Sequence, residues 1–150
     1  MKKYLILFSL FIIGLSSCQK TNVNNEQATI DDAKIQAYIK ANHITAIKDP
    51  SGLYYQVITA GAATHPGSLS TVQLTYSSSY INGVTFDQVN VVSFQMINLI
   101  KGLQIGVPKI GVGGRIMLII PSALVYGATA VNDIPANTIL VYTVDLIGFY

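Results

Sequence analysis

The sequence predicts an α+β domain built mostly of strands, with one short helix in its second half. Runs rich in β-branched and aromatic residues recur from residue 53 onward, separated by Gly, Pro, Ser and Asn. Residues 93–105 instead carry apolar side chains at helical intervals, with few helix breakers. Two further apolar runs, within 115–146, flank a long loop with Pro121 and Pro135 at its ends. A long loop on a small rigid sheet is where a binding site usually lies.

The first eighteen residues predict export. Lys2 and Lys3 form a basic start, and the apolar stretch 4–14 that follows is too short to span a bilayer. Small residues then lead to Cys18, the only cysteine of the chain. This arrangement resembles a bacterial lipoprotein signal, which implies cleavage after residue 17 and lipid attachment to Cys18. The alternative is an ordinary secretory signal with an incidental cysteine.

Composition excludes several function classes. The formal charge of +2 includes Lys2 and Lys3, so removal of 1–17 leaves seven basic and seven acidic residues. No basic cluster is interleaved with aromatics, which argues against nucleic acid as a partner. His43 and His65 stand alone and are expected on the surface, so neither a metal nor a cofactor is predicted. With its cysteine lipidated, the domain has no disulfide.

The segment before the domain divides into two parts. Residues 18–28 are polar without a hydrophobic period and predict a flexible tether. Residues 29–48 predict a helical segment, with a helix near 30–42 and a capping box formed by Thr29 and Asp32. This helix is expected to be a simple packing element; a spacer or a dimer contact is the alternative.

Asp49-Pro50-Ser51-Gly52 breaks the chain and opens the domain expected at 49–150. Alternating patterns and turn signals then set the order of elements. We expect strands at 53–58 and 71–76, a turn at 82–83, a loop and short helix across 93–105, a turn-rich stretch at 109–114, and strands at 115–120 and 139–149.

Ordered motifs between residues 51 and 149 carry a family resemblance. They are Ser51-Gly52-Leu53-Tyr54-Tyr55, Val72-x-Leu74-x-Tyr76, Asn82-Gly83-x-x-Phe86-Asp87, Leu99-Ile100-Lys101-Gly102-Leu103, Val112-Gly113-Gly114-Arg115, Ile120-Pro121-Ser122-x-Leu124-x-Tyr126-Gly127 and Ile134-Pro135-x-Asn137-x-x-Leu140-Val141-Tyr142-x-Val144-x-Leu146. Each motif is weak alone, but the ordered set resembles the FKBP-type peptidyl-prolyl cis–trans isomerases. The leader resembles that of lipoprotein members from Bacteroidetes-like bacteria. The resemblance implies a curved antiparallel β-sheet wrapped around a short α-helix.

The resemblance also implies a site. Asp87 and Tyr126 take the catalytic positions; the Tyr126 hydroxyl and the Ile100 N–H would each donate to a substrate carbonyl, while Asp87 lies at the pocket edge. The implied substrate-binding residues are Tyr76, Phe86, Phe94, Leu99, Ile100, Leu103, Ile134 and Tyr142.

Spacing alone favours plainer roles for several of these residues. Tyr76, Phe86 and Tyr142 alternate as core residues do. Asp87 follows a turn and is typical of an Asx-type cap, and Tyr126 is typical of an ordinary loop tyrosine. The resemblance reverses this interpretation for Asp87 and Tyr126.

Three stretches depart from the family pattern. Leu103 stands at the pocket floor, where many members carry Trp, so macrolide ligands are expected to bind only weakly. Residues 88–94 are hard to align, which leaves open whether Phe94 or Val92 supplies the usual pocket phenylalanine. Residues 127–133 lack the aromatic or His found in some members, and Asp133 stands where an apolar residue is common.

The implied reaction is rotation about an X–Pro bond, whose uncatalysed barrier is about 18–20 kcal/mol. An apolar pocket favours the twisted, less polar amide, so no nucleophile or metal is required. We therefore expect an isomerase acting on proline-containing segments of exported proteins, anchored to the outer membrane and facing the periplasm. The alternatives are a non-catalytic binding or chaperone lipoprotein of this fold, and a structural envelope protein.

Overall fold

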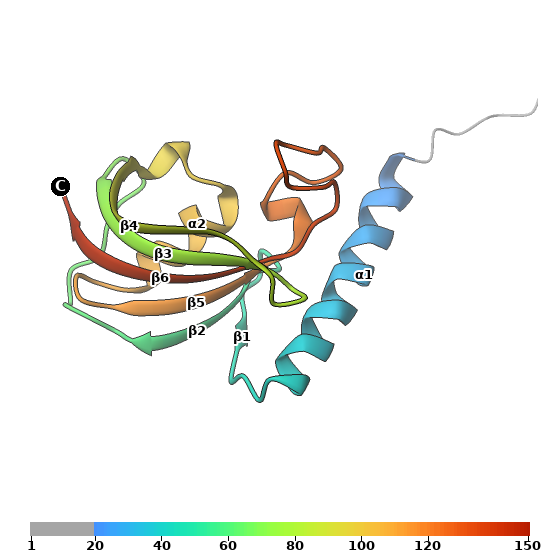
Figure 1. Cartoon of the computed structure of the whole chain (residues 1–150), viewed down its shortest axis with the longest axis horizontal. Helices are drawn as coiled ribbons and strands as arrows, with labels where there is room; N and C mark the ends of the chain where they lie inside the picture. Colours follow the sequence, from blue (N-terminus) through green and yellow to red (C-terminus); the bar gives the residue numbers. More distant parts are fainter. Residues whose placement is uncertain (1–19) are drawn as a thin grey trace, which may run out of the picture.

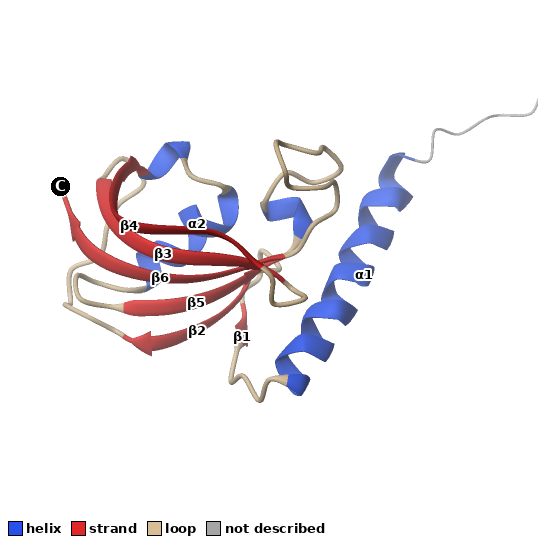
Figure 2. Cartoon of the chain, viewed as in Figure 1, coloured by secondary structure: helices blue, strands red, loops and turns tan. Residues whose placement is uncertain are grey.

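The computed structural model describes residues 20–150; the expected signal at 1–17 and the lipidation site Cys18 lie outside the described residues. The helices are α1 (Lys20–Ala41) and α2 (Lys101–Gly106), with short 3₁₀ helices η1 (Met96–Asn98), η2 (Val107–Lys109) and η3 (Ser122–Leu124). The strands are β1 (Ile47–Lys48), β2 (Tyr54–Thr59), β3 (Thr71–Tyr80), β4 (Thr85–Gln95), β5 (Arg115–Ile120) and β6 (Leu140–Phe149). Figure 2 shows the long loops that join β2 to β3 and β5 to β6.

All strand pairs are antiparallel, and the six strands form one sheet in the order β1-β2-β5-β6-β3-β4. The sheet curves around α2, while α1 lies across the end at which the β3–β4 hairpin turns (Figure 1). The predicted fold class, a curved antiparallel sheet wrapped around a short helix, is therefore confirmed.

Alternation along the strands divides the core between the two faces of the sheet. Even-numbered residues of β5 and β6, such as Leu118 and Val144, pack with Leu103 of α2 in the larger cluster. Odd-numbered residues, such as Ile119 and Val141, pack with Ile35 of α1 in the smaller one. The two helices consequently cover opposite faces.

The predicted strands and the turn at 82–83 are confirmed, but β3 is longer than predicted. β4 was not predicted, and it takes in residues 93–95 of the expected loop. Asn82 and Gly83 make the hairpin turn: Gly83 has φ +88°, and the Asn82 side-chain oxygen accepts the Val84 N–H at 3.0 Å. The short β1 was not predicted. Because β1 pairs with β2, the sheet begins two residues before the expected domain start at residue 49.

A bulge in β4 was also not predicted. Leu74 pairs with Val92 but Tyr76 pairs with Val89, so β4 has one extra residue there. Val91 adopts φ +37°, which a β-branched residue rarely does. The extra residue interrupts the period of two, and this explains why residues 88–94 were hard to align.

The expectation of a flexible tether at 18–28 is wrong from Lys20 onward, because α1 begins there and continues to Ala41. Thr29 lies inside the helix and does not cap it. The first turns of α1 are polar and show no apolar period, so the sequence pattern does not reveal them. They can still be helical, because each residue added to an existing helix gains a backbone hydrogen bond. Within residues 20–150, no helix combines the length and apolar character needed to cross a bilayer.

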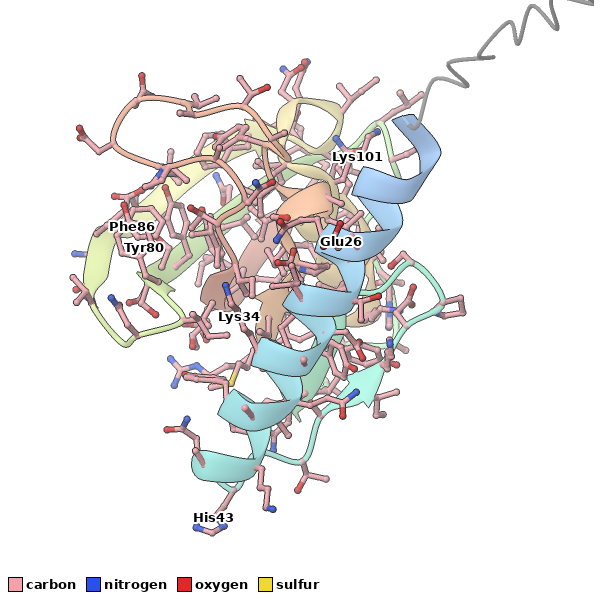
Figure 3. All side chains as sticks on the ribbon, turned by 90° about the vertical axis from the view of Figure 1, so that its right-hand side faces the viewer. Glu26, Lys34, His43, Tyr80, Phe86 and Lys101 are labelled. Atoms are coloured by element: carbon pink, nitrogen blue, oxygen red, sulfur yellow. The ribbon has the colours of Figure 1, made fainter. Side chains whose placement is uncertain are left out.

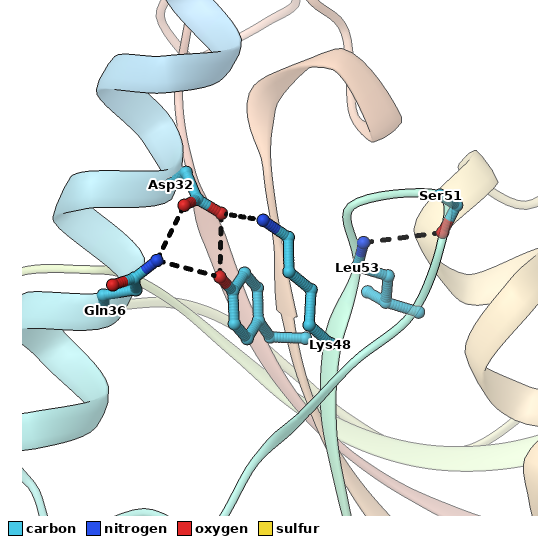
Figure 4. Close-up of polar contacts among 6 residues, drawn as sticks. Asp32, Gln36, Lys48, Ser51 and Leu53 are labelled. Atoms are coloured by element: carbon cyan, nitrogen blue, oxygen red, sulfur yellow. Dashed lines mark hydrogen bonds and ion pairs between the residues drawn. The ribbon is translucent and has the colours of Figure 1, made fainter.

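This helix packs against the sheet, as predicted. Ile35 is fully buried against the outer face of the sheet. Beside it, the Asp32 carboxylate accepts hydrogen bonds from the Tyr54 hydroxyl at 2.7 Å and from Lys48, and Gln36 donates to its second oxygen at 2.7 Å (Figure 4). These contacts tie α1 to β1 and β2. Lys48 holds the pKa of Asp32 below its ordinary value, so the carboxylate is ionised near neutral pH.

Asp49 provides a test of pH-dependent stability. Its carboxylate accepts from Lys109 at 2.8 Å and from the Ser51 N–H and hydroxyl, and these bonds lower its pKa from 3.8 to about 2. A lowered carboxyl pKa stabilises the fold fully above the unfolded value and loses that effect as pH falls through the folded value. We therefore expect Asp49→Asn to reduce stability at pH 7 and to flatten the acid-induced loss between about pH 4 and pH 2.

Urea denaturation across this pH range would measure the effect. Asp133→Asn is the matched control, because the Asp133 carboxylate has no hydrogen bond or ion pair within residues 20–150. Equal pH profiles for the wild type and Asp49→Asn would contradict the expectation.

Candidate functional site

A cavity of about 170 Å³ opens between α2, the inner face of the sheet and the loop after β5. Its lining is almost entirely apolar or aromatic: Leu74, Tyr76, Phe94, Asn98, Leu99, Ile100, Leu103, Tyr126, Tyr142 and Val144. Seven of the ten predicted site residues are thus brought together here, from five separate segments of the chain. A larger cavity of about 500 Å³ lies beside α1, but carboxylates and Lys48 line it and no aromatic side chain does.

Asp87 does not line the cavity itself, but its carboxylate accepts a hydrogen bond at 2.7 Å from the hydroxyl of Tyr76, which does. Asp87 therefore bonds across the sheet and is not an Asx-type cap; the Asx turn belongs to Asn82. Burial raises the pKa of Tyr76 well above its ordinary value of 10, and the hydrogen bond to Asp87 adds to the shift. Tyr76 accordingly keeps its proton at physiological pH.

Tyr142 lies next to Tyr76, with ring centroids 5.6 Å apart and a tilted geometry favourable for aromatic pairs. Burial raises the pKa of Tyr142 to about 12, partly offset by a hydrogen bond with Ser78. Ser78 is fully buried and also donates to the Asp87 carbonyl at 3.2 Å. Tyr76 and Tyr142 are therefore both neutral at physiological pH. Ser78 of β3 supports Tyr142 through their hydrogen bond.

Two residues that line the cavity carry hydrogen-bond donors without partners in the described part of the chain. The Tyr126 side chain is 39% exposed, and its hydroxyl has no hydrogen bond within residues 20–150. The Ile100 N–H precedes α2 and has no acceptor within that range either. Helix starts leave such groups unpaired unless a ligand or a cap accepts them. A bound carbonyl could accept from each donor.

The β4 bulge decides which phenylalanine reaches the cavity. Residues 87 and 94 would lie on opposite faces of a regular strand, since they are seven apart. The extra residue near Val91 shifts the alternation by one, so Phe94 lines the cavity on the same face as Asp87. Val92 pairs with Leu74 and does not line the cavity.

Phe86 and Ile134 do not line this cavity, although both pack against the same core cluster. Phe86 stacks on Tyr80, with centroids 4.8 Å apart (Figure 3). The Tyr80 hydroxyl then donates to the Asp133 carbonyl at 2.9 Å. This contact fastens the loop 127–133 to the sheet from outside the cavity.

Four residues at or beside the cavity were not among the predicted site residues. The sequence predicts Leu74 and Val144 only as strand residues, and their position beneath the cavity follows from strand pairing. Asn98 lies in η1, which has no recognisable sequence signal. Gln104 fixes the neighbouring turn by donating to the Ile97 carbonyl at 3.0 Å and to the Leu99 carbonyl at 2.6 Å.

The arrangement suits binding of a compact apolar group between two donors. Within residues 20–150, no group of His, Cys, Asp or Glu side chains has the arrangement of a metal site. The titratable groups that line the cavity are tyrosines, whose hydroxyls can donate to a carbonyl. The Asp87 carboxylate, bonded to Tyr76, can only accept.

Comparison with known proteins identifies related chains. Residues 62–147 match the family described as FKBP-type peptidyl-prolyl cis-trans isomerase. FkpA of Escherichia coli K12, named as an isomerase of this type, is 38% identical over 101 residues, covering 65% of this chain and 37% of FkpA. The outer membrane protein MIP of Legionella longbeachae is 30% identical over 131 residues, covering 83% of this chain and 56% of MIP.

Solved structures agree with these sequence matches. The crystal structure of FkpA from Escherichia coli superposes with a TM-score of 0.74 at 30% identity, covering 87% of this chain and 63% of that one. The chain spans only 37% of the length of FkpA and 56% of the length of MIP in the sequence matches. The match of 62–147 covers α2 and the strands that form the cavity, whereas α1 precedes it.

Proposed function

The chain belongs to the FKBP-type peptidyl-prolyl cis–trans isomerase family, and from this premise we propose that it accelerates rotation about X–Pro bonds. One observation carries the proposal: an aromatic, apolar cavity of about 170 Å³ is lined by two residues whose donors, the Tyr126 hydroxyl and the Ile100 N–H, have no partner within residues 20–150. A prolyl ring is compact and apolar and would fill this cavity, leaving the carbonyls on either side within reach of the donors.

The chemistry requires no covalent step. A planar amide is polar and well solvated, whereas the twisted amide has lost its resonance. Transfer into an apolar cavity therefore raises the free energy of the planar form more than that of the twisted form. This difference lowers the barrier to rotation. Donors that hold the flanking carbonyl add stabilisation where charge is redistributed during rotation. Tyr76 holds Asp87 at the cavity edge, where its carboxylate can accept from polarised donors near the substrate carbonyl.

The remaining predicted contacts have assigned places in this proposal. The prolyl ring would be enclosed by Tyr76, Phe94, Leu103 and Tyr142, with Leu99 at its border. The substrate residues on either side of the proline would contact Phe86 and Ile134. Leu103 offers less surface than a Trp floor would. We therefore propose a preference for flexible peptide segments and only weak binding of macrolide ligands.

We further propose that the protein is a lipoprotein of the cell envelope, of the kind found in Bacteroidetes-like bacteria. The basic and apolar start followed by Cys18 supports lipid attachment after removal of 1–17. The name of MIP, an outer membrane protein, is compatible with the outer membrane as the site of anchoring. Its substrates would then be exported proteins that fold in the periplasm.

Cis–trans exchange of a Leu-Pro peptide, followed by NMR or in a protease-coupled assay, tests the function. We expect micromolar protein to accelerate exchange well above the spontaneous rate. Tyr126→Phe is expected to lower kcat/KM about threefold to tenfold, since it removes one hydrogen bond to the substrate. Exchange at the spontaneous rate would overturn the proposal. Peptide binding without acceleration would instead identify a non-catalytic binding protein of the same fold.

A further inference from the structure

α1 carries a buried carboxylate that the proposed reaction does not use. Asp31 is 1% exposed, and no other acidic residue within residues 20–150 is buried. One carboxylate oxygen accepts from the Ser122 N–H at 2.8 Å and from the Ser122 hydroxyl at 2.6 Å. The other oxygen accepts from the Gln27 amide at 2.8 Å. Both oxygens of this buried carboxyl group therefore have hydrogen-bond partners, as buried polar groups in folded proteins generally do.

Ser122 fixes the turn at residues 123–127 through its backbone carbonyl. Its carbonyl accepts the Val125 N–H at 3.0 Å and the Gly127 N–H at 2.8 Å. These two amides stand directly before and after Tyr126. Val125 has φ −109° and ψ −104°, outside the regular regions, and such a conformation persists only where surrounding contacts fix it.

We propose that Asp31 is a positioning residue for Tyr126: it fixes Ser122, and Ser122 fixes the two peptide units that aim the Tyr126 side chain into the cavity. The inference rests on the proposed function, because it concerns the donor that would contact substrate. It makes α1, which lies outside the matched range 62–147, part of the functional site.

The geometry favours hydrogen bonding over packing as the source of this effect. A cavity of about 500 Å³ lies between α1 and the turn, with Asp31, Pro121 and Ala123 among its lining residues. No residue of 121–127 belongs to the apolar cluster that seats α1 on the sheet. The helix itself is held elsewhere, by Ile35 against Tyr54, Ile119 and Val141. Loss of the Asp31 carboxylate should therefore release the turn while leaving α1 docked.

Three variants separate positioning from general stability. Asp31→Ala leaves the Ser122 N–H and hydroxyl buried without an acceptor. Asp31→Asn keeps one acceptor oxygen and acts as the conservative rescue. Asp32→Asn is the matched control, since it changes the adjacent carboxylate of the same helix, which binds Lys48 and Tyr54 and not the turn.

We expect Asp31→Ala to lower kcat/KM about tenfold, because small misplacement of a contacting group is costly. Asp31→Asn should recover at least half of this loss on a logarithmic scale, and Asp32→Asn should stay within about twofold of the wild type. Rates are to be measured well below each unfolding midpoint. A second readout is NMR: in Asp31→Ala, amide exchange at Val125 and Gly127 should accelerate and the Tyr126 ring resonances should shift.

The two readouts fail independently. If the wild type has no isomerase activity, the proposed function falls, but exchange at Val125 and Gly127 still shows whether Asp31 fixes the turn. Unchanged exchange and unchanged Tyr126 resonances in Asp31→Ala would overturn the positioning role. So would an equal loss of activity in Asp32→Asn, or a loss in Asp31→Ala that matches the unfolded fraction alone.

Discussion

Replacing Asp87 with alanine is expected to lower kcat/KM for X–Pro exchange about tenfold, the value of one charge-assisted hydrogen bond. Asp87 accepts the Tyr76 hydroxyl at 2.7 Å, and Tyr76 is part of the cavity wall. Without this acceptor the hydroxyl must find water or a new partner, and the ring is no longer held. The charge that Asp87 directs at the cavity edge is lost at the same time.

Two variants divide these contributions. Asp87→Asn keeps an acceptor for Tyr76 but removes the charge, so a loss close to that of Asp87→Ala would assign the effect to charge. Asp145→Ala is the control, because Asp145 is also a strand carboxylate but pairs with Arg115 at 2.6 Å on the face that turns away from the cavity. Wild-type kcat/KM in Asp87→Ala would remove Asp87 from the proposed site.

The second large effect concerns stability, and it arises where α2 meets β5. Gly102 is buried, and a Cβ added there would lie 2.3 Å from Cγ2 and 2.8 Å from Cδ1 of Ile120. Ile120 is fully buried and stiff at Cβ, so it has no room to move aside. Gly102→Ala is therefore expected to cost about 2 kcal/mol of unfolding free energy by overpacking, despite the better helix propensity of alanine.

Urea denaturation measures this loss, and a double mutant identifies its cause. In the Ile120→Ala background the side-chain atoms that the added Cβ would strike are gone. Adding Gly102→Ala should then leave the unfolding free energy almost unchanged or raise it. Gly67→Ala is the control, because the nearest atom to its added Cβ lies 3.9 Å away. A stabilised Gly102→Ala single variant would show that α2 can shift away from the sheet.

Much of the fold was predictable because its signals are local. Alternation marked β2, β3, β5 and β6, Asn82-Gly83 marked the hairpin, and apolar spacing marked α2. The same analysis missed the helical residues before position 29, whose polar composition gives no period. It also missed β1, which at two residues is too short to show any period.

The candidate site was predicted less evenly. The residues around the cavity were recognised from motifs whose order resembles a family, and seven of them do meet there. Phe86 and Ile134 pack beside the cavity instead. The ring of Phe86 lies against that of Tyr80 in a tilted pair. Ser78, which supports Asp87 from the neighbouring strand, gave no signal, since a serine in a strand is ordinary until its partners are known.

The sequence by itself determined the strand content, the hairpin turn, the short helix and the family, because each depends on residues close together in the chain or on motifs kept in order. Only the tertiary structure decided that Phe94 shares a face with Asp87, and that Asp31 bonds to Ser122, ninety-one residues further along. The bulge at Val91 depends on how β4 pairs with β3, and the Asp31 bond depends on where Ile35 seats α1. Local periodicity contains neither fact, because both follow from contacts formed only when distant segments pack.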